Sequence, residues 1–268
     1  MAQEIFKRVE EKWLLPKEEY RRLLPELRKH MEEDVYGKYT ISNIYYDTAD
    51  FRLIRESLEK PVYKEKLRLR LYGDADENGK VFAEIKKKYK GIVYKRRIGM
   101  KLRDARRWLN YGIAPAEGGL NGTAPAEGGL GGTALSGGQG GGDASFTEKQ
   151  IFREISYMKD RYGLRPAVFI AYDRTALAGT EDPELRVTFD TNIRCRTEEP
   201  DLAAGMQGMQ LLPPDTVLME VKIPGAMPLW MAELFERITP YQQSFSKYGA
   251  YYEYLMKEKN KGGRKNAA

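Results

Sequence analysis

The stretch Lys64-Glu-Lys-Leu-Arg-Leu-Arg-Leu71 has a basic side chain at every even position and leucine at positions 67, 69 and 71. Successive side chains of a β-strand point to opposite faces of the sheet, so this strand has one cationic and one apolar face. The same alternation occurs at residues 8–12, 81–88, 95–97, 184–190 and 217–223. The charged face of any one strand can be an ordinary solvated face, but six strands that carry almost only Glu, Lys and Arg there favour a shared interior.

These strands predict an α+β fold in which an antiparallel sheet forms a tunnel barrel with a basic lumen. Helical patterns at residues 16–31, 147–162, 228–238 and 246–259 predict the helices that cover its outer, apolar face. Pro25 is expected to kink the first helix. A capping box of Thr147 with Gln150 and a terminal Gly163 delimit the second. A membrane barrel shares the apolar outer band, but it needs no amphipathic helices and does need export.

We expect a single domain over residues 1–268 that includes two special segments. Residues 112–145 are glycine-rich and contain a near-exact ten-residue repeat, Ala114–Thr123 followed by Ala124–Thr133, which predicts a flexible insertion. Residues 258–268 are expected to form a solvated basic tail. Acidic residues in the first dozen positions and the absence of an apolar run of about 18 residues argue against a signal peptide or a membrane span, so a cytoplasmic protein is predicted.

The 268 residues include 45 Lys and Arg against 39 Asp and Glu, a formal net charge of +6. The single histidine, His30, and the single cysteine, Cys195, exclude a His/Cys zinc site, an intrachain disulfide and a Cys-His dyad. We expect His30 to be solvated on a helix and Cys195, which alternation places on the apolar face of its strand, to be a small core residue. Any chemistry therefore depends on carboxylates, lysines, arginines and hydroxyls.

Lysines and arginines crowded on the inner face repel one another unless an anion neutralises them. The interior therefore predicts a polyanionic ligand held by charge-assisted hydrogen bonds, and a linear phosphate chain suits a tunnel. The glutamates between the basic residues could pair with them or hold a divalent cation that bridges phosphate oxygens.

Seven short motifs in order resemble the VTC domain, the catalytic domain of eukaryotic vacuolar transporter chaperone polyphosphate polymerases and of their bacterial relatives, in the triphosphate tunnel (CYTH-like) superfamily. The resemblance spans about residues 6–255, apart from the insertion. The motifs are Phe6-Lys-Arg-Val-Glu-Glu-Lys-Trp13, Ser42-Asn-Ile-Tyr-Tyr-Asp-Thr48, Lys66-Leu-Arg-Leu-Arg-Leu-Tyr-Gly73, Phe82-Ala-Glu-Ile-Lys86, Tyr172-Asp-Arg-Thr-Ala176, Leu218-Met-Glu-Val-Lys222 and Ser244-Phe-Ser-Lys-Tyr-Gly249.

The resemblance implies that the tunnel binds the triphosphate of ATP and the polyphosphate product. The residues that it implies as the catalytic phosphate-binding set are Lys12, Arg68, Arg70, Lys86, Arg174, Arg186 and Lys247. Further substrate contacts are expected from Arg8, Lys66, Lys88, Lys95, Tyr172, Lys222 and Ser246. The metal ligands would be Glu220 and Glu10, for a divalent cation that is manganese by preference and magnesium as the alternative.

Four of these assignments carry qualifications from the residues themselves. Lys88 stands where the eukaryotic enzymes have a histidine, so its proton chemistry would differ. Lys95 is assigned from strand parity. Tyr172 can equally be a core aromatic. Ser246 opens the last helix, where free backbone N–H groups favour a phosphate, although a simple N-cap serine is the alternative.

The implied reaction is in-line attack of the terminal phosphate of a growing chain on the γ-phosphorus of ATP, without a side-chain nucleophile. One alternative is a triphosphate hydrolase of the same superfamily; those relatives have Glu-x-Glu-x-Lys where this chain has Arg8-Val-Glu10-Glu-Lys12, which favours the polymerase. Another is a non-catalytic polyanion-binding module. We expect ATP and polyphosphate as partners, no nucleic acid, and a membrane partner only as a separate chain.

Overall fold

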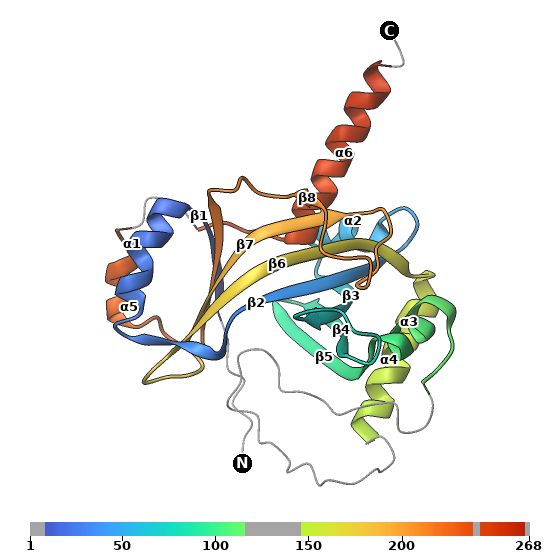
Figure 1. Cartoon of the computed structure of the whole chain (residues 1–268), viewed down its shortest axis with the longest axis horizontal. Coiled ribbons are helices and arrows are strands. Elements are labelled where there is room, and N and C mark those ends of the chain that lie inside the picture. Colours follow the sequence, from blue (N-terminus) through green and yellow to red (C-terminus); the bar gives the residue numbers. More distant parts are fainter. Residues whose placement is uncertain (1–8, 116–145, 238–241, 266–268) are drawn as a thin grey trace.

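One antiparallel sheet organises the protein (Figure 1). The computed structural model describes residues 9–115, 146–237 and 242–265. The strands are β1 (Val9–Pro16), β2 (Met31–Asp47), β3 (Tyr63–Tyr72), β4 (Lys80–Tyr89), β5 (Ile92–Lys101), β6 (Arg165–Gly179), β7 (Arg186–Arg196), β8 (Met209–Gln210) and β9 (Thr216–Ile223). Their order is β1-β9-β7-β6-β2-β3-β4-β5, and the short β8 pairs with β7. The predicted α+β class and antiparallel sheet are confirmed.

The sheet wraps around its charged face without closing. Strands β1 and β5 are the two ends of the order, and no pairing joins them in the described residues. Charges from these two sides nevertheless interact across the interior, because Glu10 and Lys12 of β1 lie close enough to influence the ionisation of Lys86 in β4. The inner face of the curved sheet therefore brings charges from its two ends near one another, and we call this face the charged groove.

Helices occupy both sides of the sheet. They are α1 (Lys17–Leu27), α2 (Arg52–Leu58), α3 (Leu102–Tyr111), α4 (Phe146–Tyr162), α5 (Leu229–Phe235) and α6 (Lys247–Lys265). The four predicted helices correspond to α1, α4, α5 and α6. The sequence patterns did not reveal α2 and α3, each of which follows a strand closely. Helix α6 extends into residues 258–265, where a tail was predicted, and residues 258–261 are exposed.

Helix α1 ends earlier than predicted. Residues 28–30 form a turn, in which the backbone N–H of Lys29 and of His30 donate to carbonyls three residues earlier. This tighter turn ends the α-helix at Leu27, so His30 lies in the turn and not on a helix as expected. Met31, predicted as the last residue of the helical stripe, is instead the buried first residue of β2.

Two features of local sequence set the other helix boundaries. The carboxylate of Asp47 accepts hydrogen bonds from the backbone N–H of Leu53 and of Ile54, at 2.8 and 3.0 Å, so it caps the start of α2. Helix α4 ends as predicted, because Gly163 has a φ of 61° and the N–H of Leu164 donates to the carbonyl of Lys159. Helix α4 begins at Phe146, so Thr147 lies inside its first turn.

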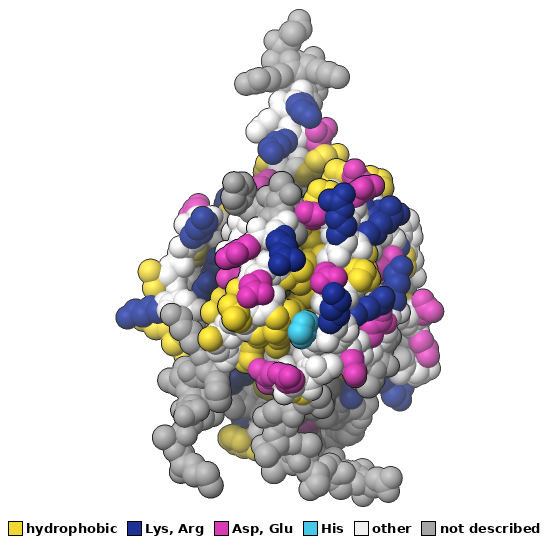
Figure 2. All heavy atoms as spheres, turned by 90° about the vertical axis from the view of Figure 1, so that its left-hand side faces the viewer, with side chains coloured by type: hydrophobic (Ala, Val, Ile, Leu, Met, Phe, Trp, Pro, Cys, Tyr) yellow, Lys and Arg dark blue, Asp and Glu magenta, His cyan; other side chains and the backbone are white. Residues whose placement is uncertain are grey.

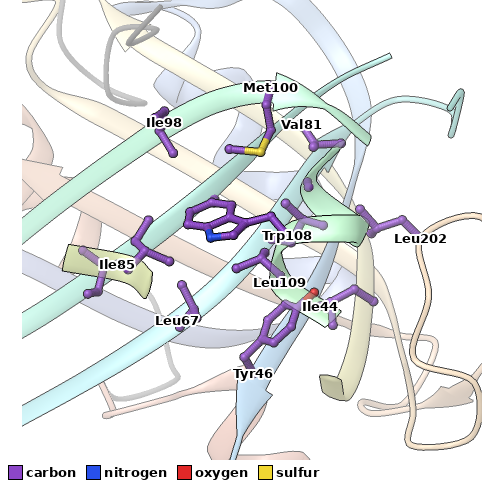
Figure 3. Close-up of a cluster of buried hydrophobic side chains, with 14 of the residues drawn as sticks. Ile44, Tyr46, Leu67, Val81, Ile85, Ile98, Met100, Trp108, Leu109 and Leu202 are labelled. Carbon is purple, nitrogen blue, oxygen red and sulfur yellow. The ribbon is translucent and has the colours of Figure 1, made fainter. Parts of the chain in front are cut away.

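The outer face of the sheet carries two apolar clusters. Helices α3 and α4 cover β3, β4 and β5, where Trp108 lies among leucine, isoleucine and methionine side chains (Figure 3). Trp108 stacks on Phe152 of α4 and donates to the hydroxyl of Ser156 at 3.0 Å. Helices α1 and α5 cover β1, β7 and β9. The alternation in residues 64–71 thus separates this apolar packing from the charges on the other face.

Helices α2 and α6 pack at the inner face, so the prediction that α6 covers the outer, apolar face is wrong. The residues that they cover include Ile170, Cys195 and Leu218, which lie in register with inner-face positions of neighbouring strands. Cys195 is buried, as predicted, but it lies on the inner face and not on the outer, apolar face where alternation placed it. It reaches the inner face because a bulge near Asn192, which has a φ of 52°, reverses the alternation within β7.

The predicted insertion at 112–145 lies outside the described residues apart from its first four, 112–115. Helix α3 ends at Tyr111, and Gly112, which has a φ of 76°, terminates that helix.

We predict that Trp108→Ala lowers the free energy of unfolding by about 3–5 kcal/mol, because it removes a buried ring from between α3, α4 and the sheet. Tyr111→Ala on the same helix is the control, since Tyr111 is 75% exposed and should contribute little. Urea unfolding measures both variants. Equal losses would contradict the assignment of Trp108 as the packing centre of this face.

Candidate functional site

Strands β3, β4 and β5 align their inner-face side chains in four rows. The register places residues of the three strands directly opposite one another. In order along the groove, the rows are Arg70–Phe82–Gly99, Arg68–Glu84–Arg97, Lys66–Lys86–Lys95 and Lys64–Lys88–Val93. The first two rows contain arginines, and the last two contain lysines. The alternation of Lys64 to Leu71 is what brings these cations to one face.

Glu84 is the centre of the arginine rows. Its carboxylate is 1% exposed and lies 2.5 Å from Arg68, 3.2 Å from Lys95, 3.5 Å from Arg97 and 3.8 Å from Arg70. Arg70, itself 2% exposed, also donates to the side-chain oxygen of Asn43 at 2.9 Å. One carboxylate thus positions four cations and leaves an excess of positive charge, which favours an anion in the groove.

Asp190 organises the opposite wall. This fully buried carboxylate forms two hydrogen bonds with Arg174 of β6, at 2.7 and 2.9 Å, and one with Lys247 of α6, at 2.5 Å. Burial alone would raise the pKa of Asp190, but Arg174 and Lys247 outweigh burial and hold that pKa below its usual value. Asp190 therefore remains ionised and fixes both cations.

Tyr172 connects the two walls. Its ring lies under Lys247, whose ammonium is 4.3 Å from the ring centroid, and beside Arg174 at 5.2 Å. Its hydroxyl accepts a hydrogen bond from Arg70 at 3.4 Å. Tyr172 is 3% exposed, so the ring is packed as a core aromatic while it also contacts cations of the groove.

Lys12 lies between the two predicted metal ligands. Its ammonium is 2.8 Å from Glu10 and 3.4 Å from Glu220, and Lys222 lies 3.3 Å from Glu220 on the other side. Burial opposes the ionisation of Glu220, but Lys222 and Lys12 outweigh burial and lower its pKa well below the usual value. Glu10 and Glu220 also influence each other's ionisation. The two carboxylates are therefore ionised and close together.

The start of α6 reaches the lysine rows. Lys66 donates to the hydroxyl of Ser246 at 3.4 Å, and the same hydroxyl accepts from the N–H of Gly249 at 3.2 Å. Ser246 therefore acts as an N-cap while it faces the groove. Burial, together with the neighbouring Lys64 and Lys86, lowers the pKa of Lys66 to about 8.

Most predicted site residues converge on the charged groove. Arg186 also has a carboxylate partner, Asp34, at 3.0 Å. Lys88 lies at the exposed end of the groove. Arg8 lies outside the described residues. Within the described ranges, no cluster of three or more His, Cys, Asp and Glu side chains has metal-site geometry.

A model of the family described as the VTC domain matches residues 7–256. The chain belongs to the VTC domain family. The resemblance of the seven motifs is thereby confirmed. No curated protein matches this VTC domain.

Solved structures similar to this VTC domain include one from Bacillus halodurans and one from Hippeastrum. One is a proposed adenylate cyclase from Bacillus halodurans, with 14% identity, coverage of 89% of this chain and 93% of that chain, and a TM-score of 0.49. The other is a proposed adenylyl cyclase from Hippeastrum, described as having a dominant triphosphatase activity. Its identity is 14%, its coverage 92% of this chain and 95% of that chain, and its TM-score 0.45.

The carboxylates that organise the VTC domain groove were not assigned roles from the sequence. Glu84 lies two residues from Lys86, and Asp190 lies four residues from Arg186. Because side chains an even number of residues apart share a face of a strand, alternation placed both carboxylates on the charged face. Their several cation partners come from other strands and from α6, which the alternation of side chains cannot reveal.

In the part of the chain that the structure describes, no helix of the VTC domain has the length and apolar character needed to cross a membrane.

We predict that triphosphate binding to the VTC domain weakens about tenfold more between pH 7 and 9 in wild type than in Lys66→Arg. A lysine with a pKa of about 8 is protonated at pH 7 and mostly neutral at pH 9, whereas arginine stays charged. Calorimetric titration with inorganic triphosphate at both pH values measures the difference, and the arginine variant corrects for titration of the ligand itself. The same pH dependence in both proteins would contradict the low pKa.

We also predict that Asp190→Asn lowers the free energy of unfolding at pH 7 by about 3–5 kcal/mol, because it leaves Arg174 and Lys247 without their buried counter-charge. Because the folded-state pKa of Asp190 is depressed, its stabilisation is fully present above about pH 4 and is lost as the pH falls through the folded-state value.

Urea unfolding of both proteins from pH 7 down to pH 3 checks this, and the Asp190→Asn variant should show the weaker acid dependence. Asp50→Asn is the matched control, since Asp50 forms an exposed ion pair with Arg55 and should contribute little. An Asp190 variant as stable as the Asp50 variant would contradict the role of this carboxylate.

Proposed function

We propose that this VTC domain is an ATP-dependent polyphosphate polymerase that transfers the γ-phosphate of ATP to a polyphosphate chain held in the charged groove. The observation that carries the proposal is the pair of buried carboxylates, Glu84 and Asp190, which hold six cations at the two walls of one groove. This arrangement retains a net positive charge and needs little reorganisation when a phosphate group binds. A cytoplasmic location, where ATP is available, is part of the same proposal.

In the proposed reaction, a terminal oxygen of the chain attacks the γ-phosphorus, the bond to the β-phosphate oxygen breaks, and ADP leaves. Arg68 and Arg70 from one wall, and Arg174 and Lys247 from the other, would align the two phosphate groups and stabilise the charge on the transferred group. The acceptor phosphate is itself the nucleophile, so the protein contributes position and charge.

The positions of the single histidine and single cysteine support this assignment. Figure 2 shows the histidine at the surface beside apolar side chains, where His30 stacks on Trp230 at 4.3 Å, away from the groove. Cys195 is buried, and burial raises the pKa of its thiol to about 12, although Lys247 opposes the shift. A protonated, enclosed thiol is a poor nucleophile.

The groove fits a divalent cation in its donor chemistry. Glu10 and Glu220 are ionised oxygen donors that share Lys12, and phosphate oxygens of the substrate would complete the coordination. Manganese and magnesium both accept such a set of oxygen ligands. When bound, the cation would neutralise negative charge on the phosphates. Lys12 would remain as the residue that keeps the two carboxylates ionised and oriented.

We predict that the purified protein, incubated with manganese and ATP labelled at the γ-phosphate, forms labelled chains that grow with time. Arg68→Ala should lower the rate on the order of 100-fold, because it removes a charge-assisted donor positioned by Glu84. Glu220→Ala should lower it and also weaken the dependence on manganese. Lys29→Ala is the control, since Lys29 forms only an exposed pair with Glu26.

The products distinguish the proposal from its alternatives. Release of labelled phosphate without chains would identify a triphosphate hydrolase instead of a polymerase. Binding of polyphosphate with no turnover of ATP under any metal would identify a polyanion-binding module. Circular dichroism of each variant separates loss of activity from loss of fold.

A further inference from the structure

Apart from Lys95, which lies 3.2 Å from Glu84, the lysines of the two lysine rows lack, within the described residues, the carboxylate partner that the arginines have. Lys66 lies opposite Lys86, and Lys64 lies opposite Lys88, on adjacent antiparallel strands. Like charges directly opposite one another destabilise a sheet. No ion pair joins these four lysines to a carboxylate of the described residues, whereas Arg68 and Arg70 share Glu84. The positive charge therefore becomes less compensated toward the Lys64 end of the groove.

This positive charge continues beyond the ends of the strands. The N–H of Lys90, in the turn between β4 and β5, donates to the carbonyl of Val62 at 3.0 Å, so this turn lies against the segment that precedes β3. Lys60 belongs to that segment and is close enough to Lys64 to act on its ionisation. Lys60, Lys88 and Lys90 are exposed, and Lys64 is half-buried.

The nearby acids do not neutralise this set. Glu65 lies on the opposite face of β3, where it accepts a hydrogen bond from Tyr63 at 2.7 Å and lies 3.9 Å from Lys87. Glu59 is a single exposed acid beside Lys60. Burial lowers the pKa of Lys64, and Lys88, Lys86 and Lys60 lower it further. The charged groups that act on Lys64 are therefore other lysines.

We propose that Lys60, Lys64, Lys88 and Lys90 form a distal phosphate-binding surface that holds the part of a polyphosphate chain extending out of the charged groove. The inference rests on the proposed function, since it takes the groove to bind phosphate. Lys64 lies four residues from Arg68 along β3, a separation of about 13 Å, so a triphosphate seated among the arginines does not extend over the distal lysines. The distal surface therefore contributes only to longer chains.

Binding measurements with two ligands test this surface. The test variant is Lys60→Ala/Lys64→Ala/Lys90→Ala, and the ligands are inorganic triphosphate and long-chain polyphosphate. We expect the variant to bind long chains at least tenfold more weakly and triphosphate with unchanged affinity. The slope of log affinity against log salt for long chains should fall by about 2, because each phosphate contact by a cation contributes about 0.7 in single-stranded polyanions.

Two matched variants complete the design. Lys17→Ala/Lys149→Ala/Lys257→Ala removes the same charge from exposed positions on α1, α4 and α6, and it should retain long-chain affinity. Lys60→Arg/Lys64→Arg/Lys90→Arg keeps the charge and should restore long-chain binding. Thermal unfolding of all three checks that they fold.

Each of the other outcomes would contradict the proposed distal surface for a different reason. Unchanged long-chain binding by the alanine variant refutes it and leaves the proposed function intact. An equal loss in the α1/α4/α6 variant shows that only overall charge matters. A parallel loss of triphosphate binding shows that the distal lysines are not a separate surface. If wild type binds neither ligand, the proposed function fails as well.

Discussion

Electrostatic repulsion among the cations of the inner face limits how this protein can fold. Lysines and arginines from seven strands and one helix face a common groove, and their mutual repulsion disfavours the compact state. Glu84 and Asp190 counter this repulsion from buried positions on opposite walls, where each holds several cations. Such buried charges are stable only when paired and hydrogen-bonded, so each carboxylate and its partners form a unit that tolerates little movement.

The apolar outer face supplies the stability that this charged interior requires. The leucines that alternate with Lys66, Arg68 and Arg70 pack beneath α3 and α4, together with Trp108. The same strand thus contributes leucines to the core on one side and cations to the groove on the other. Helix α6 also contributes to both packing and charge. Lys247 pairs with Asp190 in the groove, while Tyr248 is buried among apolar side chains.

Several parts of the fold and the site could be predicted from local pattern, and others could not. Alternation identified the strands and the side on which Lys12, Arg68 and Lys86 lie, because the period of a strand is two wherever it is regular. It failed at Asn192, where a bulge reverses the faces. Helix α2 was missed because its start depends on a capping carboxylate, Asp47, that belongs to the preceding strand.

The cationic face of the sheet and the VTC domain family can both be recognised in the amino-acid sequence, because alternation and short motifs are properties of consecutive residues. Which cations are paired with a carboxylate depends on how the chain folds. Glu84 meets its partners through cross-strand register, Asp190 meets Lys247 through the docking of α6, and the distal lysines oppose one another across β3 and β4. These pairings join residues far apart in the chain, and their electrostatic energies depend on distance and burial, which only folding sets.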